Sequence, residues 1–156
     1  MDPTEPNQDR QTPSPTTRRR LAALDVGDKR IGVAVTDALR ITCQPVGTVE
    51  RQSLAKDCAA IEAMLAPYDV ELVVAGLPLN PRGDEGEQAD RVRHFCERFT
   101  RETGRQVAYQ DERFSTAEGE RMLIQSGIRR GKRREVRDRI AAALILQRWL
   151  DSGSGA

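Results

Sequence analysis

Acidic residues occur at three places in this chain where a carboxylate needs an explanation. Asp25 interrupts the run Leu21-Ala22-Ala23-Leu24-Asp25-Val26-Gly27, which is apolar on both alternating faces and predicts a central strand covered by helices on each side. A carboxylate buried there costs free energy unless it is paired, protonated or bound to a metal ion. The alternative is that Asp25 holds the following turn through backbone N–H groups, as aspartate often does.

Asp138 lies on a second apolar stripe. On the last predicted helix it precedes Ala141, Ala142, Ile145 and Trp149 by 3, 4, 7 and 11 residues, a spacing that places all five positions on one face. Asp138 is therefore predicted to face the sheet, and the solvent side is predicted to carry Arg139, Gln147, Arg148 and Asp151. An acid in the first turn of a helix is favourable in itself, but that preference does not explain its place on the buried stripe.

The third position is Asp111-Glu112-Arg113, at the end of a predicted strand where ligands bind in sheets of this kind. Asp111 and Glu112 point to opposite faces, so only one of them can join Asp25. Spacing alone does not choose between the two. Arg113 is equally consistent with holding a phosphate and with pairing to a neighbouring acid.

Three oxygen ligands brought together from strands and a helix suit Mg²⁺ or Mn²⁺. Two such ions roughly 4 Å apart can activate a water molecule and stabilise the leaving oxygen of a phosphodiester. This chemistry requires neither a histidine nor a cysteine nucleophile. It is compatible with a chain whose single histidine, His94, lies in a predicted helix rich in Arg and Glu and is expected on the surface.

A basic segment leads into the helix that carries Asp138. It contains Arg129, Arg130, Lys132, Arg133, Arg134, Arg137 and Arg139, with Glu135 and Asp138 as the interspersed acids. Such a run is usually a solvated surface. Because it adjoins the proposed metal site, and because Gly127 and Gly131 are expected to leave it mobile, it favours contact with a nucleic-acid backbone, with Lys29 and Arg30 adding to it. An aromatic content of 4% argues against base stacking.

The totals describe one domain. The chain has 156 residues, a net charge of +1 and 38% hydrophobic residues, so nucleic-acid affinity must come from local clusters. Three separated cysteines without a C-x-x-C pair argue against disulfides or zinc and are typical of a reducing cytoplasm, where we expect the protein. Residues 1–19 and 152–156 are expected to be disordered or flexible tails around a domain over 20–151.

The order of predicted elements indicates the fold. Strands are expected over 21–26, 31–36 and 44–50, a helix over 53–65, a strand over 71–77, a helix over 87–103, a strand over 106–110, and helices over 115–127 and 134–150. An antiparallel meander followed by crossover units predicts a mixed five-stranded sheet with helices on both faces. This is the α/β architecture of ribonuclease H-like proteins.

Four segments resemble the YqgF/RuvX family of bacterial ribonuclease H-like proteins. They are Asp25-Val26-Gly27-Asp28-Lys29-Arg30-Ile31-Gly32-Val33-Ala34, Val74-Ala75-Gly76-Leu77-Pro78-Leu79-Asn80, Asp111-Glu112-Arg113-Phe114-Ser115-Thr116 and the run from Asp138 to Gln147. The resemblance implies a metal-dependent nuclease that trims pre-16S ribosomal RNA and is related to Holliday junction resolvases. It implies the catalytic and metal-binding acids Asp25, Glu112 and Asp138, and so favours Glu112 over Asp111. Asp28 and Phe114-Ser115 depart from the usual family residues without removing a ligand.

Two other interpretations stay open beside the nuclease. A non-catalytic RNA-binding factor for ribosome assembly would keep the fold and depend on the basic segment alone. An actin-like ATPase would use Asp25-x-Gly27 as a phosphate-binding turn, but it needs two such domains and 156 residues are too few. The sequence favours RNA over DNA as partner and leaves open both the choice of ion and the choice between monomer and homodimer.

Overall fold

The computed structural model of the chain describes residues 19–113 and 130–153. The elements follow the predicted order: β1 (Arg20–Val26), β2 (Arg30–Thr36), β3 (Cys43–Glu50), α1 (Leu54–Leu65), β4 (Val70–Leu77), α2 (Glu87–Thr103), β5 (Val107–Asp111) and α4 (Arg130–Asp151). The expected tail before residue 19 and the expected helix over 115–127 lie outside the described residues.

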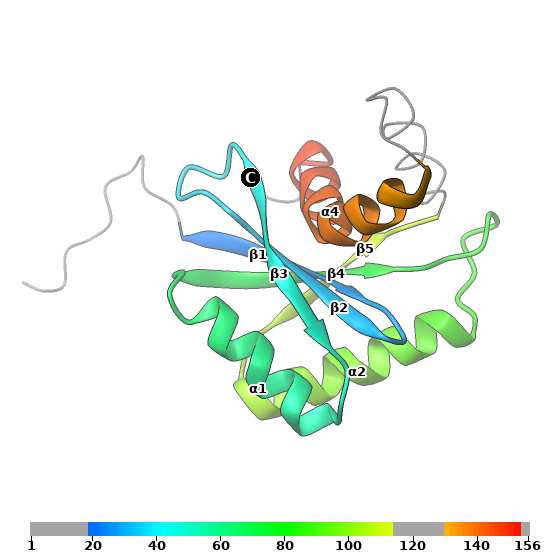
Figure 1. Cartoon of the computed structure of the whole chain (residues 1–156), viewed down its shortest axis with the longest axis horizontal. Helices are drawn as coiled ribbons and strands as arrows, with labels where there is room; N and C mark the ends of the chain where they lie inside the picture. The colour runs from blue at the N-terminus through cyan, green and yellow to red at the C-terminus, as the bar shows by residue number, and fades with distance from the viewer. Residues whose placement is uncertain (1–18, 114–129, 154–156) are drawn as a thin grey trace, which may run out of the picture.

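The strands form one mixed sheet in the order β3-β2-β1-β4-β5. Strands β1, β2 and β3 are joined as an antiparallel meander, whereas β1 pairs with β4 and β4 with β5 in parallel. Figure 1 shows α1 and α2 together on one face of the sheet and α4 on the other. The predicted mixed five-stranded sheet with helices on both faces is therefore confirmed, and β1 is its central strand.

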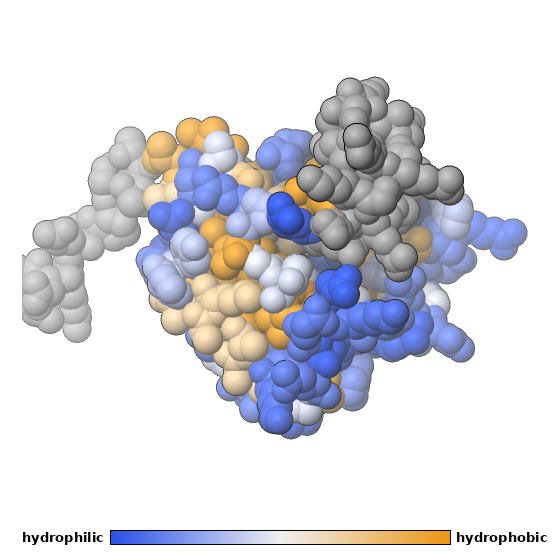
Figure 2. All heavy atoms as spheres, in the orientation of Figure 1, coloured by the Kyte–Doolittle hydropathy of each residue, from blue (hydrophilic) through white to orange (hydrophobic). Residues whose placement is uncertain are grey.

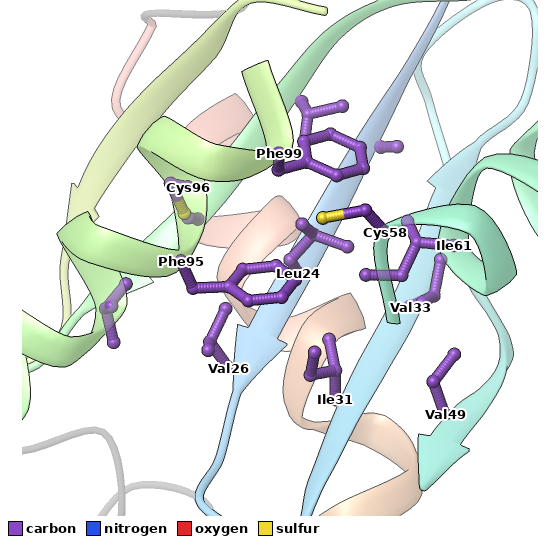
Figure 3. Close-up of a cluster of buried hydrophobic side chains, with 14 of the residues drawn as sticks. Leu24, Val26, Ile31, Val33, Val49, Cys58, Ile61, Phe95, Cys96 and Phe99 are labelled. Atoms are coloured by element: carbon purple, nitrogen blue, oxygen red, sulfur yellow. The ribbon is translucent and has the colours of Figure 1, made fainter. Parts of the chain in front are cut away.

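The two faces of the sheet have cores of different size. The larger core lies under α1 and α2, where Phe95 and Phe99 stack with ring centroids 6.3 Å apart and pack beside Leu24 and Ile61 (Figure 3). Both phenylalanines are fully buried, which makes this face the larger source of hydrophobic stabilisation. On the other face, among the described elements, α4 covers a smaller core to which it contributes Ala142, Ile145 and Leu146.

Helix α4 begins at Arg130, four residues before the predicted start at residue 134. The backbone of most of the basic segment is therefore helical, and Gly131 lies inside the helix instead of forming a mobile joint. One glycine costs a helix only about 1 kcal/mol relative to alanine. The neighbouring Lys and Arg residues are good helix formers, so this cost does not end the helix.

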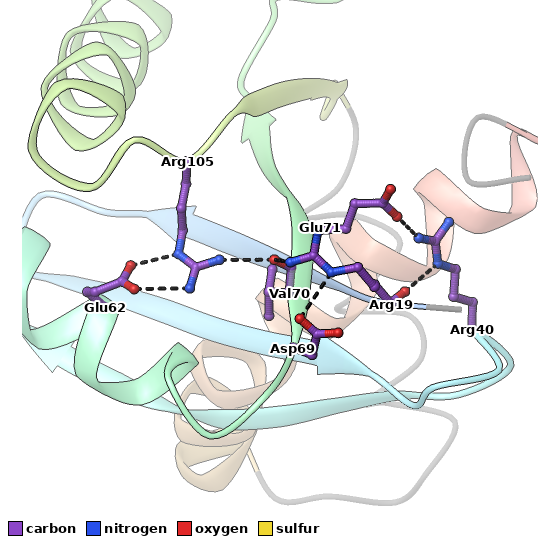
Figure 4. A network of polar contacts seen from close by, with 7 residues as sticks. All are labelled: Arg19, Arg40, Glu62, Asp69, Val70, Glu71 and Arg105. Carbon is purple, nitrogen blue, oxygen red and sulfur yellow. Dashed lines mark hydrogen bonds and ion pairs between the residues drawn. The ribbon is translucent and has the colours of Figure 1, made fainter. Parts of the chain in front are cut away.

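A polar network fastens the beginning of the parallel strands (Figure 4). Arg105 donates two hydrogen bonds to Glu62 on α1, at 2.6 and 3.0 Å, and a third to the Val70 carbonyl at 3.1 Å. Arg19 pairs with Asp69 at 3.0 Å and donates to the same carbonyl at 3.1 Å. The hydrogen bond to Glu62 raises the pKa of Arg105 above its ordinary value. These contacts hold α1, β1 and β4 together at one end of the sheet.

The face of the molecule in Figure 2 has both polar and apolar areas. Hydrophilic atoms cover much of it, and hydrophobic atoms gather at the loop between β2 and β3 and in the lower middle of the view. In that loop Leu39 and Ile41 are 52% and 65% exposed. None of the helices in the described ranges is both long and apolar enough to cross a membrane.

Candidate functional site

Asp25 lies near the end of the central strand and faces α4. Side chains alternate along a strand, and Leu21 and Ala23 belong to the core beneath α4, so Asp25 points to the same side. It pairs with Gly32 of β2, and its neighbour Leu24 pairs with Ala75 of β4. Asp25 is half-buried, whereas the apolar residues on either side of it are buried. The predicted placement of a carboxylate on the central strand is confirmed.

The turn after Asp25 is fixed by backbone and side-chain contacts. The Gly27 N–H donates to the Arg30 carbonyl at 3.0 Å, and a Cβ at position 27 would come within 2.7 Å of that oxygen, so only glycine fits. Arg51 donates to the Gly27 carbonyl at 3.0 Å. The buried Asp57, in turn, accepts hydrogen bonds from the Gln52 N–H at 2.9 Å and from Arg51 at 3.4 Å. This chain of contacts holds the end of β1 that carries Asp25.

Glu112 follows β5 directly and continues its pairing with β4. Its N–H donates to the Leu77 carbonyl at 3.0 Å, so its backbone keeps the alternation of the strand. Val107 and Tyr109 pack against the core beneath α2, which puts Glu112 on the opposite side, facing α4. Only 7% of its side chain is exposed. Glu112 therefore shares a face of the sheet with Asp25.

Gly76 lies on β4, the strand between those that carry the two acids. A Cβ at this position would lie 2.9 Å from Glu112 Cγ and 2.6 Å from Ile145 Cδ1, closer than real Cβ atoms come. The side chains of Glu112 and Ile145 thus fill the space that a larger residue would need. Because Gly76 is next in register after the Leu24–Ala75 pair, it lies beside Asp25. Between Asp25 on β1 and Glu112 after β5, strand β4 therefore has a residue without a side chain.

Asp111 has a different environment from Glu112. Its carboxylate receives hydrogen bonds from Arg113 Nε at 2.8 Å and Nη2 at 2.7 Å, and from the Arg113 N–H at 3.0 Å. The side-chain contact with Arg113 holds the pKa of Asp111 below its ordinary value. Arg113 also lies against Gly83, whose φ of +89° favours glycine. Of the two roles open to Arg113, pairing with a neighbouring acid is the one that the structure shows.

Arg148 of α4 reaches the acid site, which the sequence pattern did not predict. Its Nη1 atom donates to Glu112 Oε2 at 2.5 Å, and only 23% of its side chain is exposed. The prediction that Arg148 lies on the solvent side is therefore wrong. At about 100° per residue, Arg148 lies about 60° from Ile145 around the helix, at the border of the apolar stripe. An arginine at such a border is the signal that could have identified it.

The remaining predicted site residues are described less completely. Asp138 belongs to α4, on the stripe that continues to the buried Ala142 and Ile145, but its side chain lies outside the described atoms. Lys29 is exposed, and Arg30 forms an ion pair with Glu50 at 3.5 Å. Arg129 and the side chains of Arg130, Lys132, Arg133 and Arg134 also lie outside the described part. His94 is exposed, as predicted.

The donor set can be compared with what a divalent ion requires. Asp25 and Glu112 supply carboxylate oxygens on one face, the ligand type that Mg²⁺ and Mn²⁺ prefer. Among the described side chains there is no group of three His, Cys, Asp or Glu that could hold a metal ion. Asp138 does not belong to the described side chains. The described residues therefore fit as part of a hard-cation site that a third acid would complete.

Comparisons with known proteins identify the family of this chain. Residues 19–152 match the RuvX family, described as Holliday junction resolvase. A protein of Desulforamulus reducens is 42% identical over 135 residues, which cover 86% of this chain and 98% of the relative. A protein of Myxococcus xanthus is 44% identical over 133 residues, covering 85% and 88%. Both bear the name "Putative pre-16S rRNA nuclease".

A solved structure shares the architecture. The Holliday junction resolvase of fowlpox virus superposes with a TM-score of 0.50 at 14% identity, covering 85% of this chain and 98% of the viral protein. This likeness supports the ribonuclease H-like fold and nothing finer. The long matches at more than a third identity carry the assignment further: this chain belongs to the RuvX family, as its four sequence motifs predicted.

Proposed function

We propose that this chain is a divalent-metal-dependent nuclease that acts on the end of pre-16S ribosomal RNA. The family is described by Holliday junction resolution, and the relatives are named for a pre-16S rRNA nuclease. Both descriptions share one reaction, the hydrolysis of a phosphodiester bond, and the chain is a hydrolase of that class. Branched DNA is the second candidate substrate because the family description names the Holliday junction.

One observation carries the proposal. Asp25 and Glu112 are 87 positions apart in the sequence but lie on the same face of the sheet. Gly76, which has no room for a larger residue, lies on the strand between them. Glu112 is almost fully buried and Asp25 is half-buried, so both carboxylates lose solvation. A divalent ion bound to both would offset part of that cost.

The proposed roles follow from what positions each residue. Asp25, Glu112 and Asp138 would hold Mg²⁺ or Mn²⁺, and the bound ion would lower the pKa of a water molecule and stabilise charge on the phosphate oxygens. Strand pairing with Leu77 fixes the backbone of Glu112, and Arg51 fixes the turn that follows Asp25. These contacts set the positions of two ligands before any substrate arrives, which reduces the reorganisation that the reaction requires.

The proposed substrate contacts lie around these acids. Lys29 and Arg30 follow Asp25, and Arg113 follows Glu112, so phosphates on either side of the cleaved bond would meet a cation. The proposed basic contacts at the beginning of α4 are Arg129, Arg130, Lys132, Arg133 and Arg134. In the structure Arg30 and Arg113 pair with Glu50 and Asp111, and a phosphate would have to compete with these surface ion pairs. Such pairs contribute no more than about 1 kcal/mol, so the exchange is inexpensive.

Cleavage assays with defined substrates test the proposal. The purified protein is incubated with a structured RNA containing the pre-16S end and with a four-way DNA junction, each with Mg²⁺, Mn²⁺ or a chelator. We expect metal-dependent cleavage of the RNA, and we expect Asp25→Asn to reduce its rate at least about a thousandfold, because the neutral amide is a poor ligand. RNA affinity should change little, since phosphate contacts come from the basic residues.

A matched variant and three outcomes make the assay decisive. Asp28→Asn changes the exposed acid three residues away and should leave the rate within about threefold. Full cleavage by Asp25→Asn would refute the metal site. RNA binding without cleavage by the natural chain under every condition would establish the assembly-factor alternative. Cleavage of the DNA junction alone would reassign the substrate.

A further inference from the structure

Arg148 places a permanent positive charge inside the acid site. Its guanidinium is three-quarters buried and donates directly to Oε2 of Glu112, whose side chain is 7% exposed. A guanidinium does not lose its proton in a protein, so this charge is present at every pH that the fold tolerates. Glu112 therefore has one oxygen held by a cation supplied by the chain itself, before any metal ion binds.

The contact changes both the charge and the geometry of the site. The described acids Asp25 and Glu112 are both negatively charged, and Arg148 adds one positive charge beside Glu112. A divalent ion beside Glu112 would be repelled by the guanidinium, and in a partly buried site such repulsion between neighbouring charges is poorly screened. At the same time, a carboxylate that gives one oxygen to an arginine is held in a defined orientation, which also fixes the direction of its other oxygen.

We propose that Arg148 is a positioning residue that orients Glu112 as a ligand through a single oxygen and limits the site to one tightly bound divalent ion. The guanidinium contacts Oε2 of Glu112, so an ion that bound this oxygen would have to displace it. This inference rests on the proposed metal-dependent nuclease and adds to it a residue outside the three acids. It predicts opposite effects on two measurements when the charge of Arg148 is removed: tighter metal binding and slower cleavage.

Mn²⁺ binding measured without substrate provides a readout that does not depend on activity. Free Mn²⁺ is followed by electron paramagnetic resonance during titration of the full chain, in the natural form and in Arg148→Gln. We expect the natural chain to bind one Mn²⁺ in the tight class. Arg148→Gln should bind the first ion about tenfold more tightly and gain a second site, because a positive charge close to a dication has been removed.

Cleavage by the same variant should move the other way. With Mn²⁺ at saturation, kcat of Arg148→Gln should fall about tenfold or more, because Glu112 loses the contact that orients it. KM for the nucleic acid should stay within about twofold, since Arg148 binds a carboxylate and not the substrate. Arg148→Lys keeps the charge but loses the planar fork, so we expect natural Mn²⁺ affinity with reduced kcat.

The control is Arg105→Gln, which removes another partly buried arginine paired with a glutamate, at the opposite end of the sheet. Arg105 is 20% exposed against 23% for Arg148, so the loss of packing is comparable. Its Mn²⁺ affinity and kcat should equal those of the natural chain. Unchanged or weaker Mn²⁺ binding by a folded Arg148→Gln would overturn the inference. Should that variant not fold, an unchanged kcat in Arg148→Lys would overturn it.

Failure of the underlying proposal would look different. If the natural chain binds no Mn²⁺ and Asp25→Asn behaves identically, the metal-dependent nuclease itself is refuted. If the natural chain binds Mn²⁺ and Asp25→Asn does not, while Arg148→Gln matches the natural chain, the metal site stands and only the role of Arg148 is refuted.

Discussion

Arginine–carboxylate ion pairs lie at both ends of the parallel strands, but their contacts differ. Where β4 begins, Arg19 and Arg105 each bind an acid and also donate to the Val70 carbonyl, so the guanidinium groups serve the backbone (Figure 4). Where β4 ends, Arg148 comes from helix α4 and donates to Oε2 of Glu112.

The ion pairs at the two ends differ in how deeply the acid is buried. At the first end, the side chains of Asp69 and Glu62 are 74% and 41% exposed. Replacing either acid should change the pairing of the strands little. At the second end the acid is the buried member, 7% exposed, and the arginine adapts to it. An ion pair whose acid is inside and whose geometry is set by strand pairing is typical of a functional position. The exposed pairs are typical of structural support.

Among the changes that test the difference between the two ends, enlarging Gly76 should have the largest effect on stability and cleavage. A methyl group there overlaps Glu112 Cγ and Ile145, so Gly76→Ala should displace Glu112 and cost about 2–3 kcal/mol of unfolding free energy, as overpacking does. We expect cleavage to fall about a hundredfold, which a rate assay and a urea melt measure together.

Gly47→Ala is the control for that change. Its added methyl would meet only the flexible end of Met64, at 3.2 Å, and should alter activity little. Equal activity of Gly76→Ala and the natural chain would show that Glu112 needs no close approach to β4.

Loosening the turn after Asp25 should have the next largest effect. Arg51→Gln removes the donor to the Gly27 carbonyl and leaves the buried Asp57, 2% exposed, with one fewer partner. We expect a loss of about 2 kcal/mol in unfolding free energy and a fall in kcat of about tenfold. Arg51→Gln together with Asp57→Asn should recover part of the stability. A double variant no more stable than the single would show that the two residues do not act as a pair.

Breaking the support at the other end should affect stability alone. Glu62→Gln weakens two hydrogen bonds from Arg105 and should lower the unfolding free energy by about 1 kcal/mol, because the pair is partly exposed. Cleavage should not change. A fall in kcat comparable to that of Arg51→Gln would remove the distinction between the two ends.

The smallest expected effect lies away from both ends, at Cys96 on the buried face of α2. Burial raises the pKa of the Cys96 thiol to about 12, whereas the unfolded chain ionises its thiols near 9. Because the pKa of Cys96 is higher in the folded than in the unfolded chain, the stabilisation that the neutral thiol gives the fold is complete below pH 9. It is lost as the pH rises towards 12. Between pH 7.5 and 9.5 the loss should be a little under about 1 kcal/mol for this thiol.

Cys96→Ala tests that contribution. Its unfolding free energy should depend less on pH over the same interval than that of the natural chain, as urea melts at the two pH values measure. An identical pH dependence in the two proteins would mean that other groups cause the alkaline loss, with Tyr109 the first candidate, because burial raises its pKa to about 12 as well.

Most of the architecture could be predicted because the apolar periods are unambiguous. Leu21–Val26 and Val70–Leu77 are apolar on both faces, as central strands are, and the Ala142–Ile145 stripe oriented α4 correctly. The start of α4 was missed because Gly131 suggested a boundary that neighbouring helix formers override.

The candidate site was harder to predict because it depends on distances between elements. The alternation of Asp111 and Glu112 requires one to face α4, but which one depends on which face of β5 packs against the core beneath α2. Arg148 was misplaced for a related reason. A helical projection assumes one straight stripe, whereas a residue at its border can still reach an acid at the end of an edge strand.

Helix α4 is one uninterrupted rod of 22 residues, about 33 Å long at 1.5 Å per residue. Its first turns contain the basic residues of the proposed nucleic-acid contact, and its last turns contain Arg148, which donates to Glu112. Under the proposed function, one continuous helix would therefore join the contacts to the substrate backbone with the support of a metal ligand.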